Sequence, residues 1–532
     1  MFDTTPYEIG PAFLHWLSAI AILAVVVMGL TFLFSLIAQG KKGPGNVLKS
    51  LADMASEWTQ LSCRRIWAIG HLTLKEAIRR KALYVFAVFV ALFMFGGWFL
   101  SDSGDRPDLQ AKAYISFVLT SISWLILPVI LLLSCWGLPE DIKARSLHTV
   151  VTKPVRRNEV VLGRIVGFAA VGTILLTAMG TIGYVWILRQ VPAGAQSELI
   201  SRVPVYGSLS FIDREGRDAQ KGINVGDVWD YRSYIEGATK ARAIWTFKNI
   251  DPNSLGDALT LEARFEAFRT HKGDIEKSLL VQYTFINPTT NIQAKHRPFV
   301  VEEYSQNVDV IDREFRTFDE EKDANVTYDL FNDFIDNGSL TVEVQCLDAG
   351  QYLGMSQADL FVRKPNRPFA SGYFKSIFGT WLQMVLVVAL GVTASCFLKG
   401  PVGSLLTFTF LIIGQGFREF MERLVGGEIQ GSGTLESIYR IIMHMNPQTE
   451  LDAGPATSLI QAIDLFMNKF LLLTKYIIPD FSLYATGKYV ANGFDVSWNM
   501  ALLPSLMMTL AYLIPCILLG YISLKIRELE TK

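Results

Sequence analysis

Long runs of apolar residues constrain this chain more than any other feature of its sequence. A helix needs about 20 consecutive apolar residues to span the roughly 30 Å hydrocarbon core of a bilayer. The chain has 532 residues, of which 50% are hydrophobic and only 19% charged, a composition too apolar for an ordinary soluble protein. We therefore predict an α-helical multi-pass membrane protein with about seven transmembrane helices. They are expected at residues 13–38, 83–100, 115–137, 165–188, 377–398, 402–417 and 498–524.

The distribution of Lys and Arg predicts the orientation of these helices. Basic residues gather between the first two apolar runs, between the third and fourth, and after the last. Short loops rich in Lys and Arg stay in the cytoplasm. This places the C-terminus in the cytoplasm, and the N-terminus and residues 189–374 outside it. The first run has neither a basic leader nor a small-residue cleavage site, so we expect a retained anchor in the plasma (inner) membrane.

A further apolar stretch, residues 458–478, is interrupted by Asp464, Lys469 and Lys475. An eighth crossing would also carry the basic C-terminal tail to the opposite side of the membrane. We therefore expect an amphipathic or re-entrant helix on the outer leaflet, although the alternative of a crossing stays open.

Residues 189–374 have the composition of a water-exposed domain, because they carry more than half of the 50 Asp and Glu residues. Apolar and polar residues alternate over residues 261–267, 281–285 and 340–345, as is typical of strands with one buried face. Asn287-Pro and Asn337-Gly are turn signals. These patterns predict an inserted, extracytoplasmic β-sandwich-like domain.

The predicted organisation has five parts. They are an extra N-terminal membrane helix (1–40); a cytoplasmic linker with an interfacial helix (41–84); the second to fourth spans with a cytoplasmic loop at 138–164 (85–188); the extracytoplasmic β-rich domain (189–374); and the last three spans with an outer-leaflet segment at 425–497 (375–532).

Motifs for catalysis are missing from the sequence. No G-x-x-x-x-G-K-[ST] loop is present, so ATP hydrolysis by a P-loop mechanism is not expected in this chain. The six histidines have no metal-ligand spacing, and there is no G-x-S-x-G nucleophile elbow. We expect no enzymatic activity, no metal, no cofactor and no nucleic-acid partner.

The cytoplasmic loop between the third and fourth spans carries the most specific pattern. Residues 142–151 have a partly apolar face at helical spacing, Pro154 ends that helix, and Asn158 can cap the next one, which continues into the membrane. The pattern predicts a short amphipathic helix held between two membrane helices.

This loop resembles the coupling-helix region of ABC-2-type permeases, the membrane subunits of one class of ATP-binding-cassette exporter. The family pattern has an acidic start, Ser/Thr-Leu, Pro-Val-x-Arg, an acidic residue, an aliphatic pair and Gly-Lys/Arg. The corresponding residues here are Glu140 and Asp141, Arg145-Ser146-Leu147, Pro154-Val155-Arg156-Arg157, Glu159, Val160-Val161 and Gly163-Arg164. Arg145 stands where many members carry Gly.

The order of the other segments is also similar to that of the family. A basic stretch at residues 64–84 looks like the interfacial elbow helix, and residues 398–402 look like the short turn between the family's fourth and fifth helices. The resemblance covers about residues 63–190 and 373–532. It leaves out the N-terminal span and the large insert.

The resemblance implies a permease that forms a homodimer, or a heterodimer with a similar chain, and couples to a separate ABC-type ATPase subunit to export a substrate. The residues implied at the ATPase interface are Glu140, Asp141, Arg145, Ser146, Leu147, Pro154, Val155, Arg156, Arg157, Glu159, Gly163 and Arg164. The alternative is a membrane scaffold or sensor that transports nothing, whose outer domain binds a polymer or a protein. The sequence alone does not identify the substrate.

Overall fold

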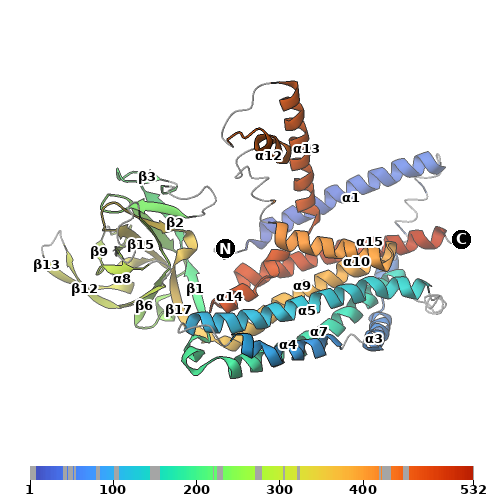
Figure 1. Ribbon diagram of the computed structural model, residues 1–532, viewed down its shortest axis with the longest axis horizontal. Coiled ribbons are helices and arrows are strands. Elements are labelled where there is room, and N and C mark those ends of the chain that lie inside the picture. The colour runs from blue at the N-terminus through green and yellow to red at the C-terminus, as the bar shows by residue number, and fades with distance from the viewer. Residues whose placement is uncertain are drawn as a thin grey trace. The chain divides into compact units, whose positions relative to one another are not determined.

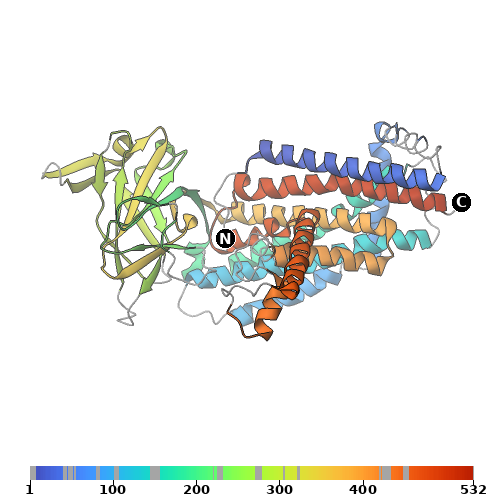
Figure 2. The same ribbon diagram turned by 90° about the horizontal axis from the view of Figure 1, so that it is seen from above.

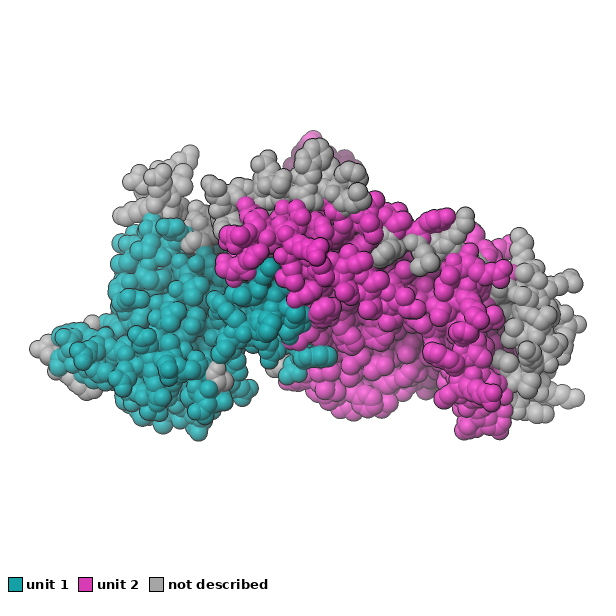
Figure 3. Space-filling view, turned by 90° about the horizontal axis from the view of Figure 1, so that it is seen from below, with its two compact units in different colours: residues 1–6, 199–372, 492–500 teal, residues 7–198, 373–491, 501–532 magenta. Residues whose placement is uncertain are grey.

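The computed structural model divides into two compact units, which are coloured in Figure 3. One unit is helical, and the other is β-rich and is built from Leu199–Gly372 together with Asn492–Met500. The structure describes residues 7–39, 45, 52, 56–79, 84–100, 107–143, 156–219, 221–223, 232–269, 278–290, 292–302, 306–319, 324–418, 421, 433–446 and 454–530.

The helical unit contains the long helices of the chain, labelled in Figure 1. They are α1 (Ile9–Gln39), α3 (Cys63–Arg79), α4 (Tyr84–Leu100), α5 (Pro107–Lys143), α7 (Arg157–Gln190), α9 (Phe369–Phe397), α10 (Gly400–Ile412), α12 (Thr434–Ile442), α13 (Pro455–Ile477) and α15 (Leu503–Glu530). Shorter turns are η2 (Ala193–Glu198), η5 (Ile413–Phe417), η6 (Phe481–Tyr484), α14 (Gly487–Ala491) and η7 (Trp498–Leu502). The turn between α9 and α10 is tight, as predicted, because only Leu398 and Lys399 separate the two helices. Pro401 lies in the first turn of α10, where its missing N–H is tolerated.

Five helices of the described chain are long and apolar enough to cross a membrane: Leu109–Glu140, Arg157–Gln190, Phe369–Phe397, Gly400–Phe417 and Trp498–Lys525. They coincide with five of the seven predicted spans, and they confirm the expectation of an apolar, multi-helix protein compatible with a membrane. The two remaining predicted spans fall on α1 and α4, which have 31 and 17 residues.

Helix α9 is the most enclosed of the five, because 78% of its apolar 18-residue stretch is buried inside the protein. Its polar side chains bond to its neighbours: the Tyr373 hydroxyl donates to the Gly180 carbonyl at 2.9 Å, and the Trp381 indole N–H donates to Thr173 Oγ1 at 2.8 Å. The Thr393 hydroxyl donates to the Cys516 carbonyl of α15 at 2.9 Å. Figures 1 and 2 show α9 running alongside α5 and α15.

Helices α12 and α13 form a hairpin that buries three charged residues, although Lys469 of α13 is exposed. The buried Asp464 carboxylate of α13 accepts the Leu435 and Glu436 N–H groups at the start of α12, at 2.9 and 2.8 Å. Glu436 and Arg440 form a second buried pair at 2.6 Å. The predicted helix at residues 458–478 is therefore present as α13, and it is not among the five candidate spans.

The β-rich unit consists of short antiparallel strands in several sheets. They are β1 (Ile200–Tyr206), β2 (Ser208–Ile212), β3 (Asp218–Ala219), β4 (Ser233–Glu236), β5 (Arg242–Phe247), β6 (Ala258–Ala263), β7 (Glu266–Arg269), β8 (Leu279–Ile286), β9 (Gln293–Lys295), β10 (Phe299–Val301), β11 (Asn307–Asp312), β12 (Glu314–Asp319), β13 (Ala324–Asp329), β14 (Ile335–Asp336), β15 (Ser339–Cys346), β16 (Gln351–Met355) and β17 (Leu360–Pro368), with η3 (Pro252–Ser254), α8 (Leu330–Phe334) and η4 (Gln357–Asp359) between them. The two larger sheets have the orders β1-β17-β6-β11 and β10-β8-β15-β5-β2-β3.

The inward-facing residues of both larger sheets belong to one apolar core. Trp245, Phe285 and Val342 from one sheet and Leu261 and Val362 from the other are completely buried within it. The strands predicted from alternation at 281–285 and 340–345 are confirmed as β8 and β15, which pair with each other.

Two details of the β-rich unit bear on the predicted strands and turns. The stretch 261–267 is not one strand, because β6 ends at Ala263 and β7 begins at Glu266 in a different sheet. Asn337 and Gly338 both have positive φ and form the tight turn between β14 and β15, as the Asn-Gly signal predicts.

A segment remote in sequence forms a single bridge to β1, at the edge of the first sheet. Arg202 of β1 donates its backbone N–H to the Gly493 carbonyl and accepts the Asp495 N–H, both at 2.8 Å. The Arg367 guanidinium pairs with the Asp495 carboxylate at 2.8 Å. Asn492–Met500, which lies shortly before α15 in the chain and includes the start of η7, thus belongs to the β-rich unit.

Candidate functional site at the start of helix α7

The loop singled out by sequence lies between α5 and α7, and the structure describes both of its ends. Glu140 and Asp141 lie in the last turn of α5, and Glu140 is exposed. Arg156 is the N-cap residue of α7 and Arg157 its first helical residue. The remaining predicted contacts lie outside the described residues: Arg145, Ser146, Leu147, Pro154 and Val155.

The start of α7 differs from the expectation that Asn158 would cap it. The helix begins earlier, at Arg157, because the Glu159 carboxylate reaches back to the N–H of the N-cap residue Arg156 at 3.1 Å. This is the reaching-back half of a capping box. Asn158 instead uses its side-chain N–H to donate to the Glu57 carbonyl at 3.2 Å.

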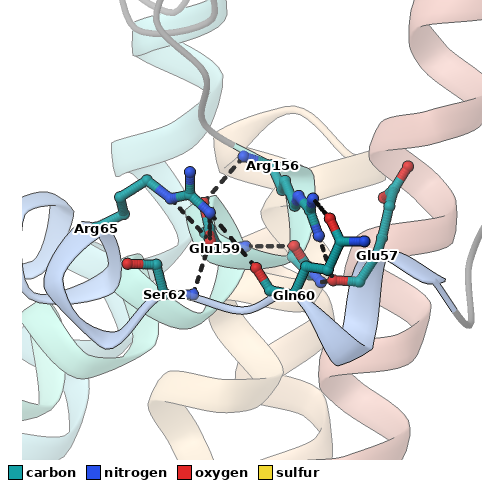
Figure 4. A network of polar contacts seen from close by, with 7 residues as sticks. Glu57, Gln60, Ser62, Arg65, Arg156 and Glu159 are labelled. Atoms are coloured by element: carbon teal, nitrogen blue, oxygen red, sulfur yellow. Dashed lines mark hydrogen bonds and ion pairs between the residues drawn. The ribbon is translucent and has the colours of Figure 1, made fainter.

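Glu159 is completely buried and is the centre of a polar cluster, shown in Figure 4. One carboxylate oxygen accepts the Ser62 backbone N–H at 3.0 Å and two guanidinium N–H groups of Arg65 at 3.0 and 2.7 Å. The other oxygen accepts the Arg156 N–H. With its negative charge fully compensated in this way, Glu159 fixes the start of α3 against the start of α7.

A second set of contacts surrounds Glu57, which precedes α3 in the chain. The Arg156 guanidinium donates to the Glu57 carbonyl at 3.1 Å and to the Gln60 side-chain carbonyl. The Arg157 guanidinium lies 3.9 Å from the Glu57 carboxylate. The two basic residues predicted to face a partner therefore also hold residues 57–60 in place.

The same Glu57 carboxylate accepts the Tyr521 hydroxyl of α15 at 2.7 Å. Tyr521 is fully buried, and Lys525, one turn further along α15, lies beside its ring. Through this contact, the end of α15 joins the cluster. The cluster thus links three helices that are far apart in the sequence, α3, α7 and α15.

Small residues allow α3 to lie directly on α7. A Cβ atom added to Gly163 would lie 2.6 Å from the Ile69 Cβ, and one added to Gly167 would lie 2.5 Å from the Thr73 Cβ. The contact is closed at its far end by Arg164, whose guanidinium pairs with the Glu76 carboxylate at 2.8 Å. Larger residues at these two positions would keep the helices apart, so this part of the interface requires glycine.

The predicted site residues whose burial the structure describes therefore divide into two groups. Glu159, Gly163 and Arg164 are buried in the interface between α3 and α7, so we assign them to internal packing and not to contact with a partner. Glu140 and the partly exposed Arg156 and Arg157 remain accessible at the two ends of the loop.

Sequence reasoning missed Glu57, Arg65 and Tyr521, which complete the cluster. The local signal that was present is a Glu three residues after the N-cap position, followed by glycines four residues apart. The partners of these residues lie far away in the chain, where no local pattern points to them.

No cluster of three or more His, Cys, Asp or Glu suited to a metal ion occurs among the described residues. No protein family, curated protein or solved structure matches the chain.

Proposed function

We propose that the chain is the membrane-spanning permease subunit of an ATP-binding-cassette transporter, which exports a substrate by coupling to a separate ATPase. The observation that carries the proposal is the polar cluster around Glu159 and Glu57. It lies at the base of the loop with the family-like pattern, and it joins that loop to three helices, two of which are long and apolar enough to span a membrane.

The cluster suits the transmission of force from a docked ATPase. A partner that binds the loop acts on the end of α5 at Glu140 and on the start of α7 at Arg157. Because Glu159 holds α3 to α7 and Glu57 holds α15 to the same point, a displacement of the loop moves these helices together. A loop attached to one helix alone would lose the motion in local bending.

The proposal includes seven spans, with α1 and α4 added to the five candidate helices, and a plasma-membrane location with the β-rich unit outside the cytoplasm. The α12–α13 hairpin supports an apolar environment around this part of the chain. Three of its charged residues, Asp464, Glu436 and Arg440, are buried, whereas Phe466 and Ile441 are 68% and 73% exposed. Lys469 of α13 is the exception, because it is exposed. Polar groups inside and apolar groups outside is the arrangement expected in a bilayer.

The proposal further includes a dimer of this chain with itself or with a similar permease. Two cassette ATPases would then be engaged, one by each loop.

Charge reversal at the loop tests the coupling. We expect the full-length tagged chain, purified in mild detergent, to retain a cassette ATPase that the Arg156→Glu/Arg157→Glu variant loses. Because these two residues also contact Glu57 and Gln60, the matched control is Glu159→Gln, which weakens the internal cluster without changing the charge that the loop presents. Both variants must elute as monodisperse particles.

Retention of the ATPase by Glu159→Gln and its loss from the double reversal support docking at the loop. Equal retention by all three proteins contradicts it. Repeated recovery of the wild-type chain with no ATPase, but with a polymer or protein bound to the β-rich unit, favours the scaffold or sensor.

A further inference from the structure

Helix α3 presents two different sides. The buried side, formed by Ile69, Gly70, Thr73 and Ala77, packs on α7. The acidic residue of the helix, Glu76, is paired with Arg164 on this side. The charges left on the rest of α3 are therefore basic.

The exposed side combines large apolar residues with these basic ones. Trp67 is 67% exposed and Ile78 is 50% exposed, and at about 100° per residue they project within about 20° of each other. Arg64, Lys75 and Arg79 are exposed and follow on one flank of this apolar pair, within about 120° of Trp67, and Leu72, which is 51% exposed, projects about 20° beyond Arg79. An exposed Trp beside a basic stripe is typical of a helix that lies in the headgroup region of a membrane.

The chain holds α3 close to helices that are suited to a bilayer. Its buried side contacts α7 near Gly163 and Gly167, at the beginning of one of the five candidate spans. At its other end, residues 80–83 connect it to α4, whose 17 residues carry no charge. Even a fully extended connection of this length reaches only about 18 Å. The exposed side of α3 cannot lie far from the lipid headgroups.

We propose that this side of α3 is a binding surface for anionic phospholipids. Trp67 and Ile78 enter the boundary between headgroups and acyl chains, and Arg64, Lys75 and Arg79 bind the lipid phosphates. A protein partner is the less suitable occupant, because the exposed large apolar side chains, Trp67, Leu72 and Ile78, are few and the charges between them are of one sign, which matches the negative surface of a membrane leaflet. The proposal requires a bilayer and is independent of any ATPase.

The test compares the affinity of the purified full-length chain for phosphatidylglycerol and for phosphatidylcholine, measured by native mass spectrometry as lipid is added. The variant is Arg64→Gln/Lys75→Gln/Arg79→Gln. The matched control removes three exposed basic residues of the β-rich unit, Lys240→Gln/Lys248→Gln/Arg264→Gln. Hydrogen exchange of α3 verifies that the helix still docks on α7 in both variants.

We expect the wild-type chain and the control to bind phosphatidylglycerol more tightly than phosphatidylcholine, and the α3 variant to lose roughly tenfold or more of that preference. Trp67→Ala should weaken the binding of both lipids. The proposal is overturned if the wild-type chain has no preference for the anionic lipid, if the α3 variant keeps the preference, or if the variant loses a co-purifying protein while its lipid binding is unchanged.

Discussion

Replacing Glu159 with Gln should loosen helix α3 from helix α7 while leaving the rest of the helical unit folded. Glu159 is completely buried and accepts N–H groups from Ser62, Arg65 and Arg156. A glutamine fits the same space, but it has one acceptor oxygen in place of two. Its amide N–H₂ would face either the Arg156 N–H or the Arg65 guanidinium, donor against donor.

The expected cost follows from these contacts. The variant loses one hydrogen bond, and its remaining bonds from Arg65 go to a neutral acceptor and not to a carboxylate. In a fully buried environment these two changes would cost about 3 kcal/mol. The Arg65 side chain is 33% exposed and recovers part of this by hydration, so we expect about 2 kcal/mol. That corresponds to a roughly 30-fold larger equilibrium constant for opening of the contact between α3 and α7.

Hydrogen exchange of α3 in nanodiscs measures this opening, because a helix of 17 residues is marginal in water once its packing is lost. Faster exchange should be confined to α3 and to the first turns of α7. The matched control is Glu198→Gln, the same substitution at an exposed carboxylate of η2 that belongs neither to the cluster nor to the exposed side of α3. Unchanged protection of α3 in Glu159→Gln would refute the assignment of Glu159 as the residue that holds the two helices together.

Two further predictions concern packing and pH. Gly163→Ala places a methyl group against Ile69 and should lower the stability of the helical unit by about 1–3 kcal/mol in thermal unfolding, whereas Gly194→Ala, with open space around it, should have no measurable effect; equal effects of the two would contradict the close contact. In the β-rich unit, burial lowers the pKa of His296 below its usual 6.5, against the opposing effect of the Asp309 carboxylate. The unfolded chain therefore binds more protons than the folded chain as the pH falls through 6.5, and acid destabilises the fold. Exchange protection of β8 should decrease between about pH 7.5 and about pH 5.5 in the wild-type chain, and less so in His296→Gln. The same decrease in both proteins would exclude His296 as its cause.

The strands that the sequence predicts best are those whose alternation continues within one sheet. In β15, Leu340, Val342 and Val344 are completely buried, and the turn before it is set by Asn337-Gly338. The alternation at 261–267 misleads for a physical reason. Leu261 and Ala267 both point into the shared core although they belong to different sheets, and a period of two cannot reveal the change of sheet.

The candidate site could be located from the sequence but not resolved. Apolar runs and basic loops identify the ends of α5 and α7, because each is a local pattern. The burial of Glu159 depends on Arg65, which lies 94 residues earlier. A charged residue in a basic loop is expected at the surface, and only the folded chain shows that this one is enclosed. The bridge between Phe494 and Arg202 of β1 likewise follows from no local sequence pattern.

The most direct test of the central claim places a photo-crosslinking amino acid at Glu140, the exposed residue at the end of α5, in intact membranes. The proposed permease should yield a crosslinked product that contains a cassette ATPase, identified by mass spectrometry, and the same probe at the exposed Lys248 of the β-rich unit should not. No ATPase adduct from Glu140, or adducts of equal yield from both positions, would contradict the claim that this loop docks an ATPase.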